Sequence, residues 1–307
     1  MQCEEILSIF PGMLREALAE LRVNTNNLQE IRIRAGRPVT VLCGNREYIS
    51  GRVTDGAQVN EILAYLSSYS LYAYEDEIRQ GFLSLPGGHR VGLSGRTVLE
   101  SRKIKTITEI SSLNIRFAHE IRGCADGLLP HLWENGRLLH TLIVSAPGRG
   151  KTTLLRDCIR QISNGSPYNG GMTVGVVDER SEIAGSFRGV PGNDVGMRTD
   201  VLDGCPKAEG MMMLIRSMSP KVIAVDEIGS SDELAALMTA MHCGCVLLAT
   251  VHGSSMEELR KKPVLKDMME LKMFERYVVL DCGKKPGCVK MLLDRDGRET
   301  GRGGMIC

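Results

Sequence analysis

The spacing of hydrophobic residues changes along the chain and divides it into two parts. In the first part, residues 30–34 alternate polar and apolar side chains, so Ile31 and Ile33 are predicted to face a core from a half-buried strand. Further short strands are predicted at 39–43 and 114–117, and a hairpin over 81–93 with its turn at 86–88. Helical spacing is found at 1–20 and 57–79. Residues 1–127 are therefore predicted to form a small α+β domain that ends at a joint over 124–127.

From residue 128 onward, apolar runs alternate with helical patterns. The runs at 139–144, 172–177, 221–225 and 245–251 are predicted strands, and the segments 153–160, 208–218 and 232–241 are predicted helices. Alternation of this kind is typical of a parallel sheet with helices on both faces, that is, of an α/β domain over 128–307. Two closing strands are predicted at 273–280 and 288–293. The glycine-rich and charged segment 296–307 is predicted to be a disordered tail.

A glycine-rich turn connects the first predicted strand of this domain to a helix. It comprises Ser145, Ala146, Pro147, Gly148, Arg149, Gly150, Lys151, Thr152 and Thr153. Such a turn directs backbone N–H groups and the helix dipole at one point, which favours the phosphates of ATP. In the phosphate-loop pattern Lys151 reaches the β- and γ-phosphates and Thr152 holds Mg²⁺, while Ser145 replaces the usual first glycine. The alternative is a chance Gly-Lys-Thr, which the order of strand, loop and helix disfavours.

A second group of polar residues follows the apolar run at 221–225. Carboxylates at the C-terminal end of a buried parallel strand lie where α/β folds bind ligands. Asp226 is therefore a candidate Mg²⁺ ligand, and Glu227 a candidate for polarising the attacking water. The alternative is that both residues only begin the next helix, where acidic side chains are favoured.

Three more positions are candidates for contact with the nucleotide. Glu179 follows Asp178 at the end of another strand and could order water or Mg²⁺, or lie in an ordinary charged loop. His252 shares a strand face with Thr250 and could sense the γ-phosphate, or cap the next helix. Arg216 could donate charge to phosphate, in cis or from a neighbouring subunit, or be a solvated helix residue.

Composition narrows the class of protein. The chain has 307 residues and a net charge of +1, which gives no overall electrostatic attraction to nucleic acid or anionic membranes. No apolar run reaches the ~18–20 residues of a membrane span, and the acidic N-terminus does not resemble a signal peptide. The ten cysteines are expected to be reduced. Cys243 and Cys245, close to two histidines, leave structural zinc as an alternative.

Together these segments resemble the secretion ATPases of type II and type IV systems. The resemblance rests on 145–153, 177–180, 215–229 and 249–253, and segments 30–38, 85–93 and 112–117 identify the chain as a member of the stage III sporulation protein AA family. The resemblance implies a RecA-like P-loop ATPase that uses ATP and Mg²⁺. Gly229 departs from the pattern, because many secretion ATPases have arginine there.

The resemblance also implies a setting. It indicates a cytoplasmic protein, peripheral at the mother-cell face of the engulfed forespore, that energises a channel built with membrane proteins of the same operon. It implies a hexameric ring in which arginines of the N-terminal domain approach the phosphates, with Arg90, Arg96 and Arg116 as candidates. Two alternatives remain open: a nucleotide-gated scaffold with negligible turnover, and a nucleic-acid motor using the basic stripe of Arg32, Arg34 and Arg37.

Overall fold

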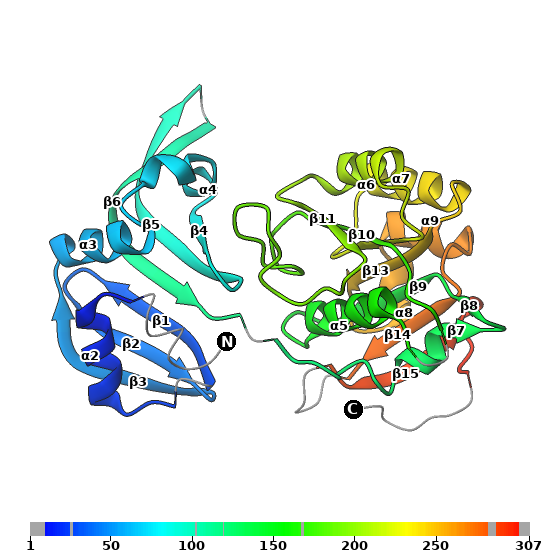
Figure 1. Cartoon of the computed structure of the whole chain (residues 1–307), viewed down its shortest axis with the longest axis horizontal. Helices are drawn as coiled ribbons and strands as arrows, with labels where there is room; N and C mark the ends of the chain where they lie inside the picture. The colour runs from blue at the N-terminus through cyan, green and yellow to red at the C-terminus, as the bar shows by residue number, and fades with distance from the viewer. Residues whose placement is uncertain are drawn as a thin grey trace. The chain divides into compact units, whose positions relative to one another are not determined.

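The computed structural model describes residues 10–24, 27–101, 103–118, 120–166, 169–281 and 287–300 (Figure 1). The chain forms two compact units, Met1–His119 with Gly185–Phe187, and Glu120–Ala184 with Arg188–Cys307. The segment predicted as the joint lies in the second unit, because the backbone N–H of Ala125 donates to Asp157 of the following helix at 2.8 Å.

The first unit is built on a six-stranded antiparallel sheet. The strand order is β3-β2-β1-β6-β5-β4. Ile31 and Ile33 are fully buried under its helices, whereas Arg32 is exposed, in agreement with the alternation in the sequence. The elements are α2 (Gly12–Leu21), β1 (Leu28–Arg34), β2 (Arg37–Cys43), β3 (Arg46–Thr54), α3 (Gly56–Leu66), the 3-10 helix η2 (Leu71–Tyr74), α4 (Glu75–Arg79), β4 (Phe82–Leu85), β5 (His89–Glu100) and β6 (Lys103–Arg116).

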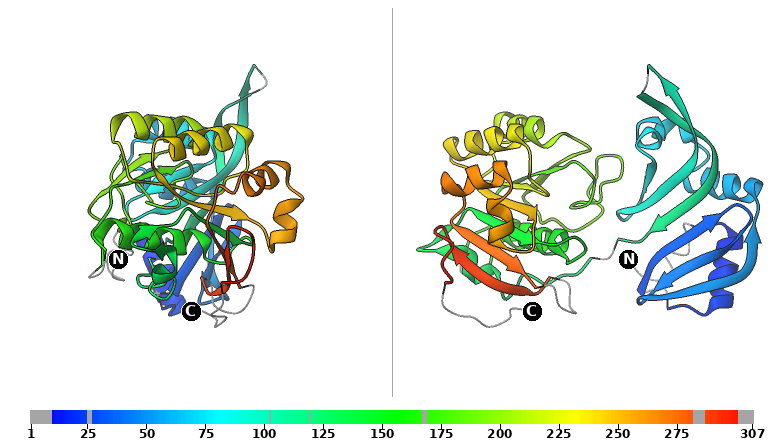
Figure 2. Two further views of the ribbon diagram at one scale, coloured as in Figure 1. Left: turned by 90° about the vertical axis from the view of Figure 1, so that its right-hand side faces the viewer. Right: turned by 180° about the vertical axis from the view of Figure 1, so that it is seen from behind.

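Strands β5 and β6 are much longer than the sequence predicted. They pair with each other as far as Glu100 and Lys103, whereas β4 pairs with β5 only up to Gly92 and β1 pairs with β6 only from Ser112. Residues 95–101 and 103–109 therefore form a two-stranded ribbon, here called the arm, that projects from the sheet (Figures 1 and 2).

The second unit contains a seven-stranded sheet with the order β11-β10-β12-β13-β9-β14-β15. Every pair is parallel except β14 with β15. The sequence analysis missed β11. The elements are η3 (Leu129–Leu132), β7 (Trp133–Glu134), β8 (Arg137–Leu138), β9 (Thr141–Ser145), α5 (Lys151–Asn164), β10 (Val174–Asp178), β11 (Thr199–Asp203), α6 (Lys207–Ser217), β12 (Val222–Val225), α7 (Ser231–His242), β13 (Val246–His252), α8 (Met256–Arg260), α9 (Pro263–Glu270), β14 (Arg276–Leu280) and β15 (Val289–Asp294).

Helices cover both faces of this sheet. Alternate residues of one strand point to opposite faces, so Ile223 packs with α6, α7 and α9, while Val222 packs with α5. Strands buried on both sides explain the nearly continuous apolar runs in the sequence. Parallel pairing also brings the C-terminal ends of β9, β10, β12 and β13 to one edge, and the candidate site is built there.

Two expectations are corrected by the structure. The predicted disordered tail is wrong for Asp296–Thr300, because these residues form a turn in which Thr300 N–H donates to Leu292 C=O at 3.0 Å; residues 301–307 lie outside the described ranges. The prediction that the cysteines are reduced is wrong for Cys288, which is disulfide-bonded. Separately, the helices in the described ranges are all too short or too polar to cross a bilayer.

Asp157 fixes helix α5 beneath the glycine-rich turn. Its buried carboxylate accepts from Ala125 N–H, from Arg160 at 2.7 Å and from Gln161 at 3.0 Å. Burial alone would raise the pKa of Asp157, but these hydrogen bonds hold it below its usual value. Because the pKa is depressed, the carboxylate stabilises the fold above its unfolded pKa of about 3.9, and this contribution is lost as pH falls through the folded value.

We expect Asp157→Asn to lower the free energy of unfolding by about 1–3 kcal/mol at pH 7. The difference from the unaltered protein should shrink below pH ~4. Urea unfolding at pH 7 and below pH ~4 measures this difference in stability. Asp267→Asn on the exposed face of α9 is the matched control. A pH-independent difference would contradict the role of the ionised carboxylate.

Candidate nucleotide-binding site

The glycine-rich turn leaves β9 and enters α5 at Lys151. Gly148 and Gly150 have φ of 72° and 82°, values that L-residues with side chains rarely adopt. Ser145 is the last residue of β9, is not in the left-handed region and pairs with His252 of β13. Serine is tolerated there because the extended backbone of a strand does not require glycine. Ala146, Pro147 and Arg149 complete the turn, and Thr152 and Thr153 stand in the first turn of α5.

Lys151 is the centre of the site. Its side chain is 7% exposed, and Nζ lies 2.6 Å from Glu227 Oε1 and 3.9 Å from Asp226 Oδ1. His252 Nε2 lies 3.5 Å from the same ammonium and 2.7 Å from Glu227 Oε1. Residues from three segments far apart in the sequence therefore meet at the start of α5, as the strand ends predict.

Asp226 and Thr152 form the second contact between the turn and β12. The Thr152 hydroxyl donates to Asp226 Oδ2 at 2.6 Å. Thr250 of β13 donates to the other carboxylate oxygen of Asp226. The hydroxyl and carboxylate proposed as Mg²⁺ ligands are thus adjacent.

Glu227 is held in an unusual backbone conformation. Its φ is 55°, in the left-handed region, and its N–H donates to Thr250 Oγ1 at 2.9 Å. Partial burial alone would raise the pKa of Glu227, but the hydrogen bond from Lys151 and the charges of Lys151, His252 and Arg180 hold it below its usual value. The carboxylate is therefore ionised at neutral pH and aimed at the glycine-rich turn.

The acidic segment at the end of β10 adds the carboxylate of Glu182 to the site. The buried carboxylate of Asp178 accepts from the N–H groups of Glu182, Ile183 and Ala184, at 2.8, 3.0 and 2.7 Å. These bonds engage Asp178 in shaping the turn. Ligand atoms of Glu182, Asp226 and Glu227 lie within 4.8 Å of one another. Clustered carboxylate oxygens beside a hydroxyl fit the hard cation Mg²⁺.

Glu179 lies beside these carboxylates but pairs with a different lysine from Glu227. Its carboxylate is 3.5 Å from Nζ of Lys207, the first residue of α6. Lys207 is 9% exposed, lies 3.0 Å from Glu233 and donates to the backbone carbonyl of Glu227 at 2.6 Å. Lys207 therefore connects the start of α6, the start of α7 and the main chain of Glu227.

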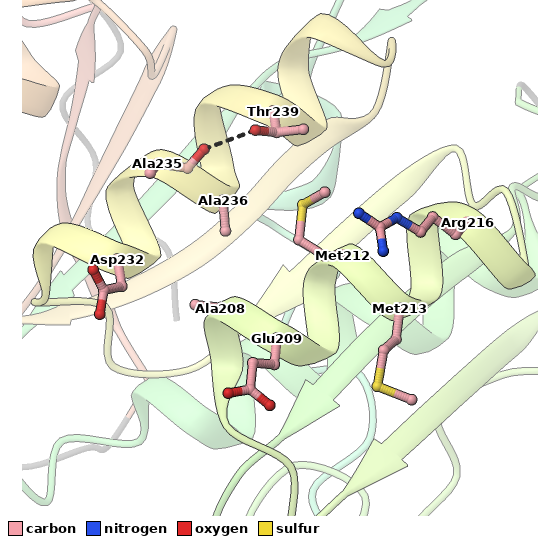
Figure 3. Close-up of a pocket in the computed structure, with 9 residues that line it drawn as sticks. All are labelled: Ala208, Glu209, Met212, Met213, Arg216, Asp232, Ala235, Ala236 and Thr239. Atoms are coloured by element: carbon pink, nitrogen blue, oxygen red, sulfur yellow. Dashed lines mark hydrogen bonds between the residues drawn. The ribbon is translucent and has the colours of Figure 1, made fainter.

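Arg216 is not brought to this cluster. It lines a surface groove of about 610 Å³ between α6 and α7, together with Glu209, Met212 and Asp232 (Figure 3). Within this chain it therefore lies outside the Lys151 cluster, and action on the phosphate of a neighbouring subunit stays a prediction. In the first unit, Arg90 stacks over Phe82 and Arg96 pairs with Glu109; their approach to phosphate, and that of Arg116, also stays a prediction.

The cysteines do not assemble a metal site in the part of the chain that the structure describes. Cys243 is exposed at the end of α7, whereas Cys245 is buried and its thiol donates to Pro220 C=O at 3.2 Å. Neither joins the group of potential metal ligands, which is Glu182, Asp226 and Glu227.

Two residues of the site, Lys207 and Glu182, were not found from the sequence. Lys207 did leave a signal, because a lysine in the first turn of a helix opposes the helix dipole and needs a compensating carboxylate. Glu182 stands three residues after Glu179 in an acidic cluster, but its position depends on the turn that Asp178 forms.

Comparison of the sequence with known proteins shows the family of the chain. The model of the family described as "Sporulation stage III, protein AA" matches residues 1–300. "Stage III sporulation protein AA" of Bacillus subtilis (strain 168) is 44% identical over 300 residues, which is 97% of each chain. The uncharacterized protein ycf45 of Porphyra purpurea is 28% identical over 297 residues, covering 95% of this chain and 48% of its own.

Solved structures share the fold at low sequence identity. The ATPase DotB of Legionella pneumophila has a TM-score of 0.60 and 15% identity, covering 94% of this chain and 79% of its own. The pilus retraction motor PilT, solved with ADP, has a TM-score of 0.56 and 14% identity, covering 92% and 80%. The chain is therefore an α/β protein that shares the P-loop fold of the ATPase DotB and the pilus retraction motor PilT.

Proposed function

The chain belongs to the sporulation stage III protein AA family, and on this basis we propose that it is a RecA-like ATPase that hydrolyses ATP to ADP and phosphate. The observation that carries the proposal is the convergence of Lys151, Glu227 and Thr152–Asp226 at one helix start. Phosphate chemistry needs these groups together: a cation for the γ-phosphate, a metal site, and a carboxylate for water.

Each group has a defined task in the proposed reaction. Backbone N–H groups of 146–152 cradle the phosphates, and Lys151 turns from Glu227 to the γ-phosphate. Glu227, released from this ion pair, orients water for in-line attack. Bound through Thr152 and Asp226, with Glu182 within reach, Mg²⁺ would supply charge neutralisation at the phosphates. His252, which contacts both Lys151 and Glu227, reports the loss of the γ-phosphate.

The wider role is proposed from the family. The chain would act at the mother-cell face of the forespore as a homo-oligomer, a hexamer in this proposal, together with membrane proteins of the same sporulation channel. Neighbours named as an ATPase and a pilus retraction motor support a motor over a scaffold.

The test is phosphate release from Mg-ATP by the purified chain, with particle mass measured by light scattering in parallel. Turnover in a hexamer-sized particle is the expected result. ATP binding without turnover would favour the nucleotide-gated scaffold, and stimulation by single-stranded nucleic acid would favour the nucleic-acid motor.

Lys207 gives a more specific prediction. Lys207→Met removes the donor that holds the Glu227 carbonyl and leaves Glu179 and Glu233 without a shared countercharge. We expect kcat to fall by about 10- to 100-fold with little change in KM, because the phosphate loop is untouched. Lys207→Arg should recover part of the rate.

Steady-state kinetics of the two variants measure this effect, with the exposed Lys266→Met as the control. A lowered melting temperature with unchanged kcat would mean that Lys207 only stabilises the fold.

A further inference from the structure

The arm, residues 95–101 and 103–109, has apolar side chains that nothing in the described chain covers. Leu99 is 63% exposed, Ile104 45% and Val98 37%. Its two strands pair only with each other, since β4 and β1 end their pairing before Gly95 and at Ser112. A two-stranded hairpin is at best marginally stable in water, so an arm of this kind is expected to be covered in use.

The exposed apolar side chains gather at the tip of the arm. Leu99 lies directly across from Ile104, so these two side chains share a face. Val98 is the preceding residue of the same strand, and the pairing shifts register between Val98 and Leu99. The three exposed side chains therefore lie close together near the end of the arm.

The charges at the tip favour an anionic surface. Lys103 and Lys105 lie on either side of Ile104. Lys105 pairs with Glu100 at 2.7 Å, and Lys103 has no ion-pair partner among the described residues. Lysine side chains can keep the ammonium at the lipid headgroups while an adjacent apolar side chain is buried. The tip extends about 15–20 Å from Gly95, enough to reach a surface ahead of the sheet.

We propose that the arm docks this protein onto an anionic lipid bilayer, with Leu99, Ile104 and Val98 inserted at the interface and Lys103 and Lys105 at the headgroups. The occupant is the lipid itself. Docking needs no nucleotide, so this proposal stands or falls separately from ATP hydrolysis.

The experiment is co-sedimentation of the full chain with vesicles of equal parts phosphatidylglycerol and phosphatidylcholine, and with vesicles of phosphatidylcholine alone. We expect binding to the anionic vesicles that weakens as salt is raised. The double variant Leu99→Ser and Ile104→Ser should bind at least about tenfold more weakly, because two apolar insertions are lost. The matched control is Ile49→Ser with Val53→Ser, equally exposed on β3 at 61% and 59%.

A second measurement reports insertion directly. Tryptophan fluorescence of Leu99→Trp should shift to the blue with anionic vesicles, and that of Ile49→Trp should not. Absence of vesicle binding by the unaltered chain, or equal loss in the arm and control variants, would overturn the proposal. Loss of oligomer mass in the arm variant without vesicle binding would assign the arm to a second copy of the chain and overturn it too.

Discussion

Replacing Glu227 with glutamine is expected to lower ATP turnover by at least about 100-fold, while ATP binding is retained or strengthened. Glutamine keeps the size of the side chain but cannot act as the carboxylate that orients water. The second effect follows from the ion pair, in which Glu227 Oε1 lies 2.6 Å from Lys151 Nζ. ATP can bind Lys151 only after the Lys151–Glu227 ion pair breaks. Removing the negative charge of Glu227 therefore makes ATP binding more favourable.

Single-turnover phosphate release and equilibrium ATP binding separate the two effects. Glu270→Gln, an exposed residue paired with Lys266 at 3.6 Å, is the matched control. Turnover at the rate of the unaltered chain would assign the water to another carboxylate, with Glu182 the first to test because it lies in the same cluster.

Lys151→Ala is expected to abolish measurable turnover and to weaken ATP binding by about 100-fold or more. The ammonium is the nearest positive charge to Glu227 and also lies 3.9 Å from Asp226. Without it, the triphosphate would meet the clustered carboxylates of Glu182, Asp226 and Glu227. Arg180, 3.0 Å from Glu227, would then offset only part of their charge. Binding and turnover should therefore fail together, unlike in Glu227→Gln.

A double variant tests whether this charge balance is the cause. Lys151→Ala leaves Glu227 partly buried without its closest partner, so the melting temperature should fall, and adding Glu227→Gln should restore part of it. Additive effects of the two substitutions on melting temperature would contradict coupling. Lys266→Ala on the exposed face of α9 serves as the control for loss of a lysine.

The candidate site could be anticipated mainly where strands determine position. Buried parallel strands are long apolar runs, and their C-terminal ends must meet at one edge, so the proximity of Lys151, Asp226, Glu227 and His252 follows from the pattern. Arg216 could not be placed this way, because helical spacing does not say which neighbour covers a helix face, and it lies in the α6–α7 groove.

The missed features depend on tertiary packing. Lys207 reaches Glu227 only because α6 packs beside β10 and β12, and Glu182 is positioned by bonds from the main chain to Asp178. The arm was missed because residues 95–109 are largely polar and lack the alternation that marks a half-buried strand. β11 is partly exposed at the edge of its sheet and has the same weak signal.

At Glu227 the backbone conformation that suits glycine and the side chain that suits the site are in conflict. For an L-residue with a side chain, the left-handed conformation is less favourable by roughly 1–2 kcal/mol, a strain that glycine would avoid. If only the stability of the fold mattered, glycine or asparagine would therefore be favoured at this position. A glutamate at this strained position therefore fits a residue that serves the chemistry of the site rather than the stability of the fold.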